Sequence, residues 1–186
     1  MLLMELFTKA VDFKWSPGVS TKQSADFTID GLIYTVYMTV MSDSRSEAEF
    51  ELISPHEVFN DVWEITFDVS TSTSWRDINL DHITGTGNAI AVFSTVIAII
   101  QDAINRNHIT NLHFSADNSE PSRVKLYDRM SKYFAKQGWR YINDKELNTR
   151  SEYDDNSNNF EAGQGNSVYL LTKQPHPHSL LKGTRA

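Results

Sequence analysis

The chain has 186 residues, 40% of them apolar, and a formal net charge of −7. This length and composition fit one globular domain with a substantial core and exclude a largely disordered chain. The negative charge argues against a protein that captures nucleic acid by broad electrostatic attraction. Because the sequence contains no cysteine, disulfides, thiol nucleophiles and cysteine-bound metals are also excluded.

The N-terminal residues lack the basic start and the cleavage site of a signal peptide. The longest apolar run, from Ala89 to Ile104, is too short and too polar for a bilayer span. We therefore expect a soluble cytoplasmic protein. Its single domain would cover residues 1–174, and residues 175–186 would form a flexible tail.

Alternating apolar and polar residues dominate the first half. Asp30-Gly31 separates two β-rich segments, 27–29 and 32–40, which is a strong cue for a hairpin. Further strands are expected over 48–53 and 62–69. In the last of these, Glu64 and Asp68 share one face with Val62 and Thr66. The first half therefore predicts an antiparallel sheet.

Helical spacing replaces this alternation in the second half. Apolar residues over 90–104 recur at helical intervals, and Asn107-His108 can end that helix. A strand over 109–116 follows, and then a second helix that begins near Pro121 and stops at Gly138. Short strands are expected over 139–142 and 167–172, with a polar loop over 143–166 between them. The whole pattern predicts an α/β (α+β) fold with a mixed, mostly antiparallel central sheet and two main helices.

Basic residues gather around the second helix. Residues 117–150 carry 8 basic and 5 acidic side chains, although the chain as a whole is acidic. Two interpretations remain open: a solvated helix face, or a surface that attracts an anionic cofactor or partner.

Two glycines, Gly85 and Gly87, come directly before the first helix. Glycine lets a ligand approach the backbone closely, and a helix start offers unpaired N–H groups with partial positive charge. Such a loop can bind phosphate or pyrophosphate, but it can equally be a simple connection.

The order of strand, glycine loop, helix, strand and helix resembles the GCN5-related N-acetyltransferase family over roughly residues 62–142. His82 stands where that family usually has Arg or Gln, Asn118 resembles its Asn, and Leu126-Tyr127 resembles its Leu-Tyr pair. Gly138-Trp139 resembles its terminal Gly-Phe pair. The chain is also similar to small GNAT-like proteins encoded by bacteriophages, which would place it in a bacterial host cell or a virion.

The resemblance implies that the loop holds the pyrophosphate of acetyl-CoA and that Tyr127 protonates the departing thiolate. The implied cofactor-binding residues are His82, Thr84, Gly85, Thr86, Gly87, Asn88 and Asn118. The chain departs from the family at several points: the loop lacks its usual basic residue, and the two early helices have no clear counterpart before Asp30. The segment 70–80 is long, and the spacings from Asn118 to Tyr127 and from Tyr127 to Gly138 are longer than is typical.

Glu64 and Asp68 are the candidates for a base that accepts the amine proton, and the alternative is that both simply face solvent. Tyr127 has a competing role as a core aromatic residue, because it is in phase with Val124 and Met130. His108 and His113 are assigned structural roles, and no cluster has metal-ligand spacing.

Two functions from different classes follow. The first is an acetyl-CoA-dependent N-acyltransferase that acts on a small-molecule or protein amine. The second is a catalytically inactive member of the same fold that serves as a structural or host-protein-binding component. A nucleic-acid binder that uses the basic helix is a weaker third hypothesis, because the overall charge is negative.

Overall fold

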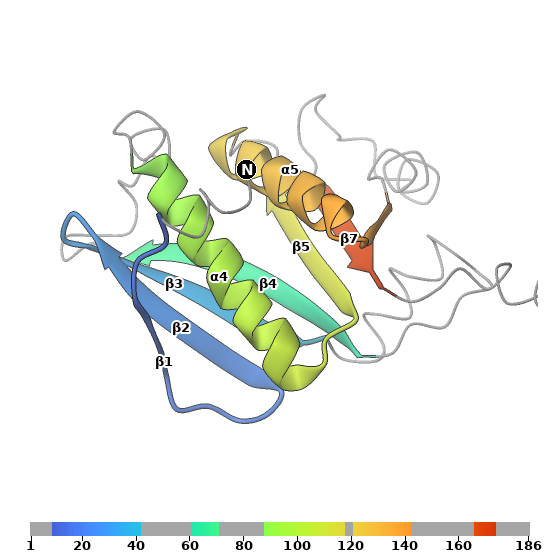
Figure 1. The fold of residues 1–186 in the computed structure, drawn as a ribbon, viewed down its shortest axis with the longest axis horizontal. Coiled ribbons are helices and arrows are strands. Elements are labelled where there is room, and N and C mark those ends of the chain that lie inside the picture. Colours follow the sequence, from blue (N-terminus) through green and yellow to red (C-terminus); the bar gives the residue numbers. More distant parts are fainter. Residues whose placement is uncertain (1–8, 42–60, 71–87, 118–120, 143–165, 174–186) are drawn as a thin grey trace, which may run out of the picture.

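The computed structural model describes residues 9–41, 61–70, 88–117, 121–142 and 166–173. These residues form a seven-stranded, mostly antiparallel sheet and two helices, with strand order β1-β2-β3-β4-β5-β7-β6. Both helices pack on the same side of the sheet, called the helix face below (Figure 1). The strands are β1 Phe13–Trp15, β2 Lys22–Ile29, β3 Leu32–Val40, β4 Val62–Ser70, β5 Asn111–Asp117, β6 Arg140–Ile142 and β7 Asn166–Thr172.

The hairpin that joins β2 to β3 confirms the prediction made from Asp30-Gly31. Ile29 pairs with Leu32, so the loop contains only these two residues. Asp30 has φ 51° and Gly31 has φ 77°. Two successive residues with positive φ match the right-handed twist of the flanking strands, which is why Asp-Gly is favoured there.

Helix α4 (Ala89–Asn107) confirms the helix predicted from the apolar spacing over 90–104 and its predicted end at Asn107-His108. It ends at His108, whose φ of 54° is left-handed. The apolar run was expected to be too short and too polar for a bilayer span, but the whole of α4 is long and apolar enough to cross a membrane by length and composition alone. Its apolar side is instead buried against the sheet, in one core with β4 and β5. Its apolar character is therefore explained by burial in the core.

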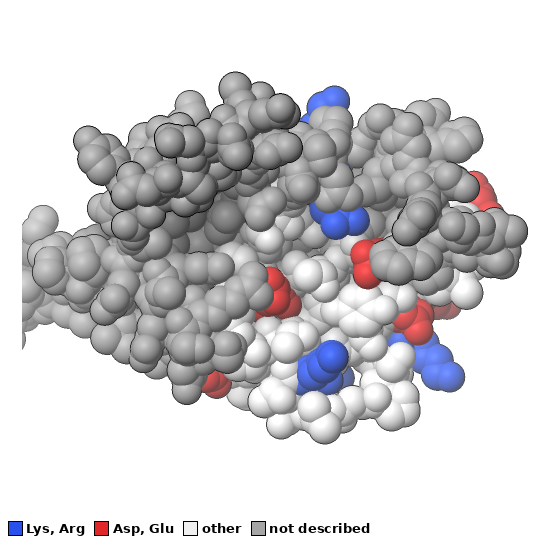
Figure 2. Space-filling view, turned by 180° about the vertical axis from the view of Figure 1, so that it is seen from behind, with Lys and Arg blue, Asp and Glu red and all other residues white. Residues whose placement is uncertain are grey.

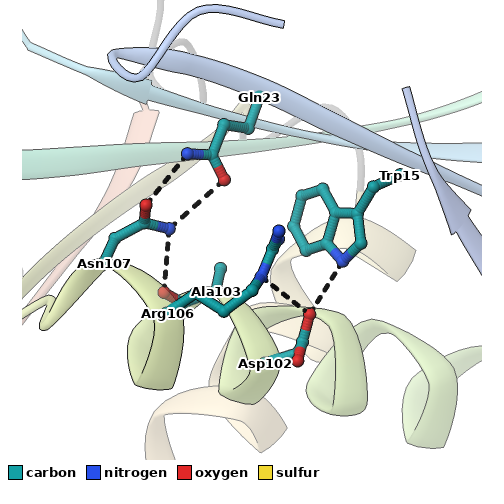
Figure 3. Close-up of polar contacts among 6 residues, drawn as sticks. All are labelled: Trp15, Gln23, Asp102, Ala103, Arg106 and Asn107. Atoms are coloured by element: carbon teal, nitrogen blue, oxygen red, sulfur yellow. Dashed lines mark hydrogen bonds and ion pairs between the residues drawn. The ribbon is translucent and has the colours of Figure 1, made fainter. Parts of the chain in front are cut away.

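Edge strand β1 is attached to α4 through an indole and a carboxylate (Figure 3). Trp15 donates its Nε1–H to Asp102 Oδ2 at 2.8 Å. Arg106 reaches the same oxygen at 3.0 Å, and its guanidinium lies 4.0 Å from the centroid of the Trp15 ring. One acceptor thus joins the strand to the last two turns of the helix.

A second attachment joins β2 to Asn107, the last residue of α4, through two side-chain amides that pair with each other (Figure 3). Gln23 donates to Asn107 Oδ1 at 3.0 Å, and Asn107 donates to Gln23 Oε1 at 3.2 Å. Asn107 also donates to the Ala103 carbonyl at 2.9 Å. Each amide satisfies the other, so β2 is fixed to the C-terminal end of α4.

Helix α5 (Pro121–Lys136) covers β5, β7 and β6 and confirms the second predicted helix. Gly138 follows it with φ 85°, the conformation expected of a glycine that ends a helix. Trp139 packs edge-on against Phe134 with 5.7 Å between ring centroids. Aromatic side chains therefore close the core at this end of the sheet.

Several expectations had a different outcome. The strand predicted over 48–53 lies outside the described residues, as does the tail over 175–186. The strand predicted from Ile109 begins two residues later, at Asn111. Strand β1 was not anticipated from the sequence at all.

Candidate active site

The only parallel neighbours in the described sheet, β4 and β5, are joined over a short distance. Their ladder contains three residue pairs: Val62 with Asn111, Trp63 with Leu112, and Glu64 with His113. Beyond these pairs, β4 continues to Ser70 and β5 to Asp117 without pairing to each other. Figure 1 shows the two strands starting close together and then separating. The sheet is therefore split between these two strands.

Glu64 and His113 face each other at the last paired position before the strands separate. The distance from His113 Nδ1 to Glu64 Oε1 is 4.0 Å. The imidazole is 2% exposed and the carboxylate side chain 23% exposed. This distance is that of an ion pair when the histidine is protonated and is too long for a direct hydrogen bond. A buried imidazole thus lies behind a carboxylate that solvent can reach.

Both side chains point away from the helices. Their neighbours along each strand, Ile65 and Phe114, belong to the core under the helices, and side chains alternate between the two faces. Glu64 and His113 therefore share the opposite face of the sheet, which Figure 2 views directly. On that face, the acidic and basic side chains of the described residues are interspersed rather than gathered in one patch.

A buried hydrogen bond supports this end of the ladder. Thr172 Oγ1 donates to Asn111 Oδ1 at 2.7 Å, and both residues have no solvent exposure. Asn111 pairs with Val62 on one side and with Thr172 on the other. The backbone that carries His113 is therefore fixed two residues before the imidazole, which restricts how far the ring can move.

Asp68, the other predicted base, lies at a different place on β4. It is exposed and pairs with Thr35, whose hydroxyl donates to Asp26 Oδ1 at 2.7 Å. Four residues of strand separate it from Glu64, which corresponds to about 13 Å. The structure therefore does not bring the two predicted carboxylates together, and Asp68 fits the solvent-facing alternative.

Tyr127 lies on the helix face in an aromatic cluster. It is 1% exposed, and its ring lies 5.1 Å from that of Phe114 and 5.9 Å from that of Tyr169. Tyr169 in turn donates its hydroxyl to Asp128 Oδ1 at 2.9 Å. This packing matches the core role that the helical phase of Tyr127 suggested. It also places Tyr127 and Glu64 on opposite faces of the sheet.

Asn88, the last residue before α4, is the one predicted cofactor-binding residue that the structure describes. Its side-chain amide donates to the Asp30 carboxylate in the β2–β3 turn. It makes no side-chain cap of the helix, although its carbonyl accepts the Val92 N–H at 2.9 Å. A carboxylate thus stands beside the start of α4. The other predicted cofactor-binding residues, His82, Thr84, Gly85, Thr86, Gly87 and Asn118, lie outside the described residues.

Two residues of this region were not recognised from the sequence as parts of a site. His113 was given a structural role, and Asp30 was assigned only to a turn. Alternation along 109–116 could have placed His113 on the face opposite to the buried Leu112 and Phe114. Only the pairing of β4 with β5 shows that His113 lies next to Glu64.

Comparisons of the chain with protein-family models, with curated proteins and with solved structures give no significant match.

Proposed function

We propose that the chain is an acetyl-CoA-dependent N-acyltransferase with a GNAT-like fold that acts on an amine acceptor. The observation that carries this proposal is the separation of β4 from β5 directly after the Glu64–His113 pair. An extended thioester chain that enters between the strands from the helix face would bring its reactive end to this carboxylate.

The order of elements supports the proposal. Strand β4 is followed by α4 and then by the parallel strand β5, so the start of α4 follows the end of β4 in the chain. The N–H groups at a helix start are a general site for phosphate groups. Gly85 and Gly87 precede that start in the sequence. A nucleotide pyrophosphate held there would lie on the helix face, with its pantetheine arm directed toward the split in the sheet.

The chemistry needs a neutral amine held next to an acetyl thioester, which acetyl-CoA supplies. Glu64 would accept one proton from the amine nitrogen as the new C–N bond forms and the C–S bond breaks. Its partial exposure lets an acceptor reach it from solvent. His113 would act as a positioning residue, because its buried ring lies 4.0 Å from the carboxylate and limits the orientations that the carboxylate can adopt.

The packing of Tyr127 does not favour a catalytic role. A side chain that is 1% exposed between Phe114 and Tyr169 contributes first to the core. The departing thiolate would then take its proton from solvent.

One observation favours the second candidate, a catalytically inactive binding protein of the same fold. Asp30 places a negative charge beside the start of α4, where an active enzyme would bind a polyphosphate. Like charges at close range disfavour such binding. The two candidates therefore differ in whether the chain binds acetyl-CoA.

A thermal-shift titration with acetyl-CoA tests the proposal first. Ligand at 100 times its dissociation constant stabilises the folded state by about 2.7 kcal/mol, so an active enzyme should show a clear rise in Tm. An unchanged Tm at millimolar acetyl-CoA would contradict the transferase and favour the inactive protein.

Kinetics with a panel of amines then test the site. Glu64→Gln should lower kcat by about 10²–10⁴-fold and leave acetyl-CoA binding unchanged, because only proton transfer is removed. His113→Asn should lower kcat by a smaller factor and leave KM unchanged. Asp68→Asn is the matched control, since it removes a carboxylate from the same strand and face. Equal losses in Glu64→Gln and Asp68→Asn would contradict the assignment of Glu64.

A further inference from the structure

Four exposed cations lie in one line on the outer side of α5. Lys125, Arg129, Lys132 and Lys136 are separated by four, three and four residues, and all four are exposed. At 100° per residue, these positions fall within about 60° of one another around the helix, and the row is about 16 Å long. We call these four residues the cationic row.

The cationic row is not neutralised by the described part of the chain. The ion pairs found there join Arg106 to Asp102 and His113 to Glu64, and neither involves the row. Asp128, the acidic residue within α5, accepts the hydroxyl hydrogen of Tyr169 and forms no ion pair with the row. The four positive charges therefore face solvent.

The spacing of the cationic row lowers the stability of α5 itself. Neighbouring members of the cationic row stand three or four residues apart, the positions at which like charges on a helix repel each other. Of the four, only Lys136 lies in the last turn, where a positive charge interacts favourably with the helix dipole and stabilises the helix. The helix dipole and the charge spacing therefore do not account for Lys125, Arg129 and Lys132.

The helix also holds the row rigidly. The inner side of α5 is packed into the core through Tyr127, Met130 and Phe134, each at most 1% exposed. Trp139 packs on Phe134 just after the helix ends. The cations are thus presented from a fixed backbone, which lowers the ordering cost of binding a partner with matching charges.

We propose that the cationic row binds an acidic helical segment of a partner protein, with carboxylates at matching intervals of four, three and four residues. Charge complementarity favours an acidic occupant, because the row carries four exposed positive charges that pair with no carboxylate among the described residues. The formal net charge of −7 disfavours a long polyanion such as DNA, which would extend beyond the row. Described α5 residues offer no exposed large aromatic side chain on which a single-stranded base would stack. The row lies on α5, whereas the proposed acyltransferase site is built from β4, β5 and the start of α4, so this inference stands apart from that site.

Fluorescence anisotropy with three labelled probes tests the inference. The first is a helical peptide of about 12 residues with Glu at the matching four positions, the second has Gln in place of Glu, and the third is a single-stranded oligonucleotide of equal charge. The wild-type chain should bind the Glu peptide more tightly than the other two probes. Added salt should weaken that binding, because exposed charges are screened.

Two double variants locate the binding surface. Arg129→Gln with Lys132→Gln should weaken binding of the Glu peptide by roughly fivefold or more. Lys14→Gln with Lys22→Gln removes the same charge from the exposed side of β1 and β2 and should leave binding nearly unchanged. Circular dichroism and Tm check that both variants fold.

Three results would overturn the inference. They are no binding of the Glu peptide by the wild-type chain at low salt, equal weakening in both double variants, or tighter binding of the oligonucleotide than of the Glu peptide.

Discussion

The Asn88 side-chain amide donates a hydrogen bond to the Asp30 carboxylate, so the residue before α4 is fixed to the turn between β2 and β3. These residues are 58 positions apart in the sequence. The contact places an acidic group where the proposed function requires an anion-binding helix start. It therefore offers a direct way to change the affinity of that site.

Replacing Asp30 by Asn should strengthen acetyl-CoA binding several-fold. Asn tolerates the left-handed φ of 51° found at this position, so the turn should be retained. The substitution removes one negative charge from the region of the pyrophosphate and with it a repulsive interaction. Isothermal titration calorimetry with acetyl-CoA measures the change. Weaker binding in Asp30→Asn would indicate that the carboxylate supports the site or that the ligand binds elsewhere.

The aromatic cluster around Tyr127 allows its core role to be separated from a catalytic one. Tyr127→Ala should destabilise the fold by about 3–5 kcal/mol, because it leaves a cavity beside Phe114 and Tyr169. Tyr127→Phe keeps the ring and should cost about 1 kcal/mol. Urea unfolding measures both changes. If Tyr127→Phe instead keeps full stability and lowers kcat by 100-fold, the packing interpretation is wrong and the hydroxyl takes part in the reaction.

Strand β1 provides a test of how the edge of the sheet is held to α4. Trp15→Phe removes the indole N–H that reaches Asp102 and the ring surface under Arg106. We expect a loss of about 1–2 kcal/mol in the free energy of unfolding, measured with urea. Asp102→Asn is the control, since it keeps an oxygen acceptor for the indole and removes only the charge. A Trp15→Phe variant as stable as the wild type would show that β1 is held by other contacts.

Two buried tyrosines predict a loss of stability at alkaline pH. Burial raises the pKa of Tyr34 above its ordinary value, and the Asp30 carboxylate raises it further. Burial also raises the pKa of Tyr133. The folded state therefore holds these protons more tightly than the unfolded state does. The stabilisation is fully present below the ordinary tyrosine pKa of about 10 and is lost as pH rises through the raised values.

Urea midpoints measured on both sides of about pH 10 check this dependence. The double variant Tyr34→Phe with Tyr133→Phe has no phenol to ionise at these sites, so its midpoint should fall less. An equal fall in the wild type and the double variant would show that other groups control the alkaline transition.

Local sequence signals predicted much of the fold. Asp30-Gly31 located the β2–β3 hairpin, and helical spacing located α4 and α5 close to their observed ends. Strand β1 was missed because three residues are too few for alternation to be recognised. Alternation also predicted the face of Glu64 correctly, since Ile65 and Phe67 are buried and Thr66 and Asp68 are exposed.

The candidate site was harder to predict than the fold, because it depends on which strands become neighbours in the sheet. Alternation within β5 cannot show that His113 pairs with Glu64, which lies on β4. Nor can a turn motif at Asp30 reveal a partner at Asn88. Both contacts arise from the order of strands and the path of α4 over the sheet, which the local pattern does not encode.

The three-pair ladder between β4 and β5 also creates two backbone edges inside a continuous sheet. An ordinary sheet exposes such edges only at its rim, and there they tend to recruit further extended chains. Here they face each other across a wedge whose apex is the Glu64–His113 pair. An extended amide-bearing molecule that paired with both edges would act as a surrogate strand and bridge the two halves of the domain.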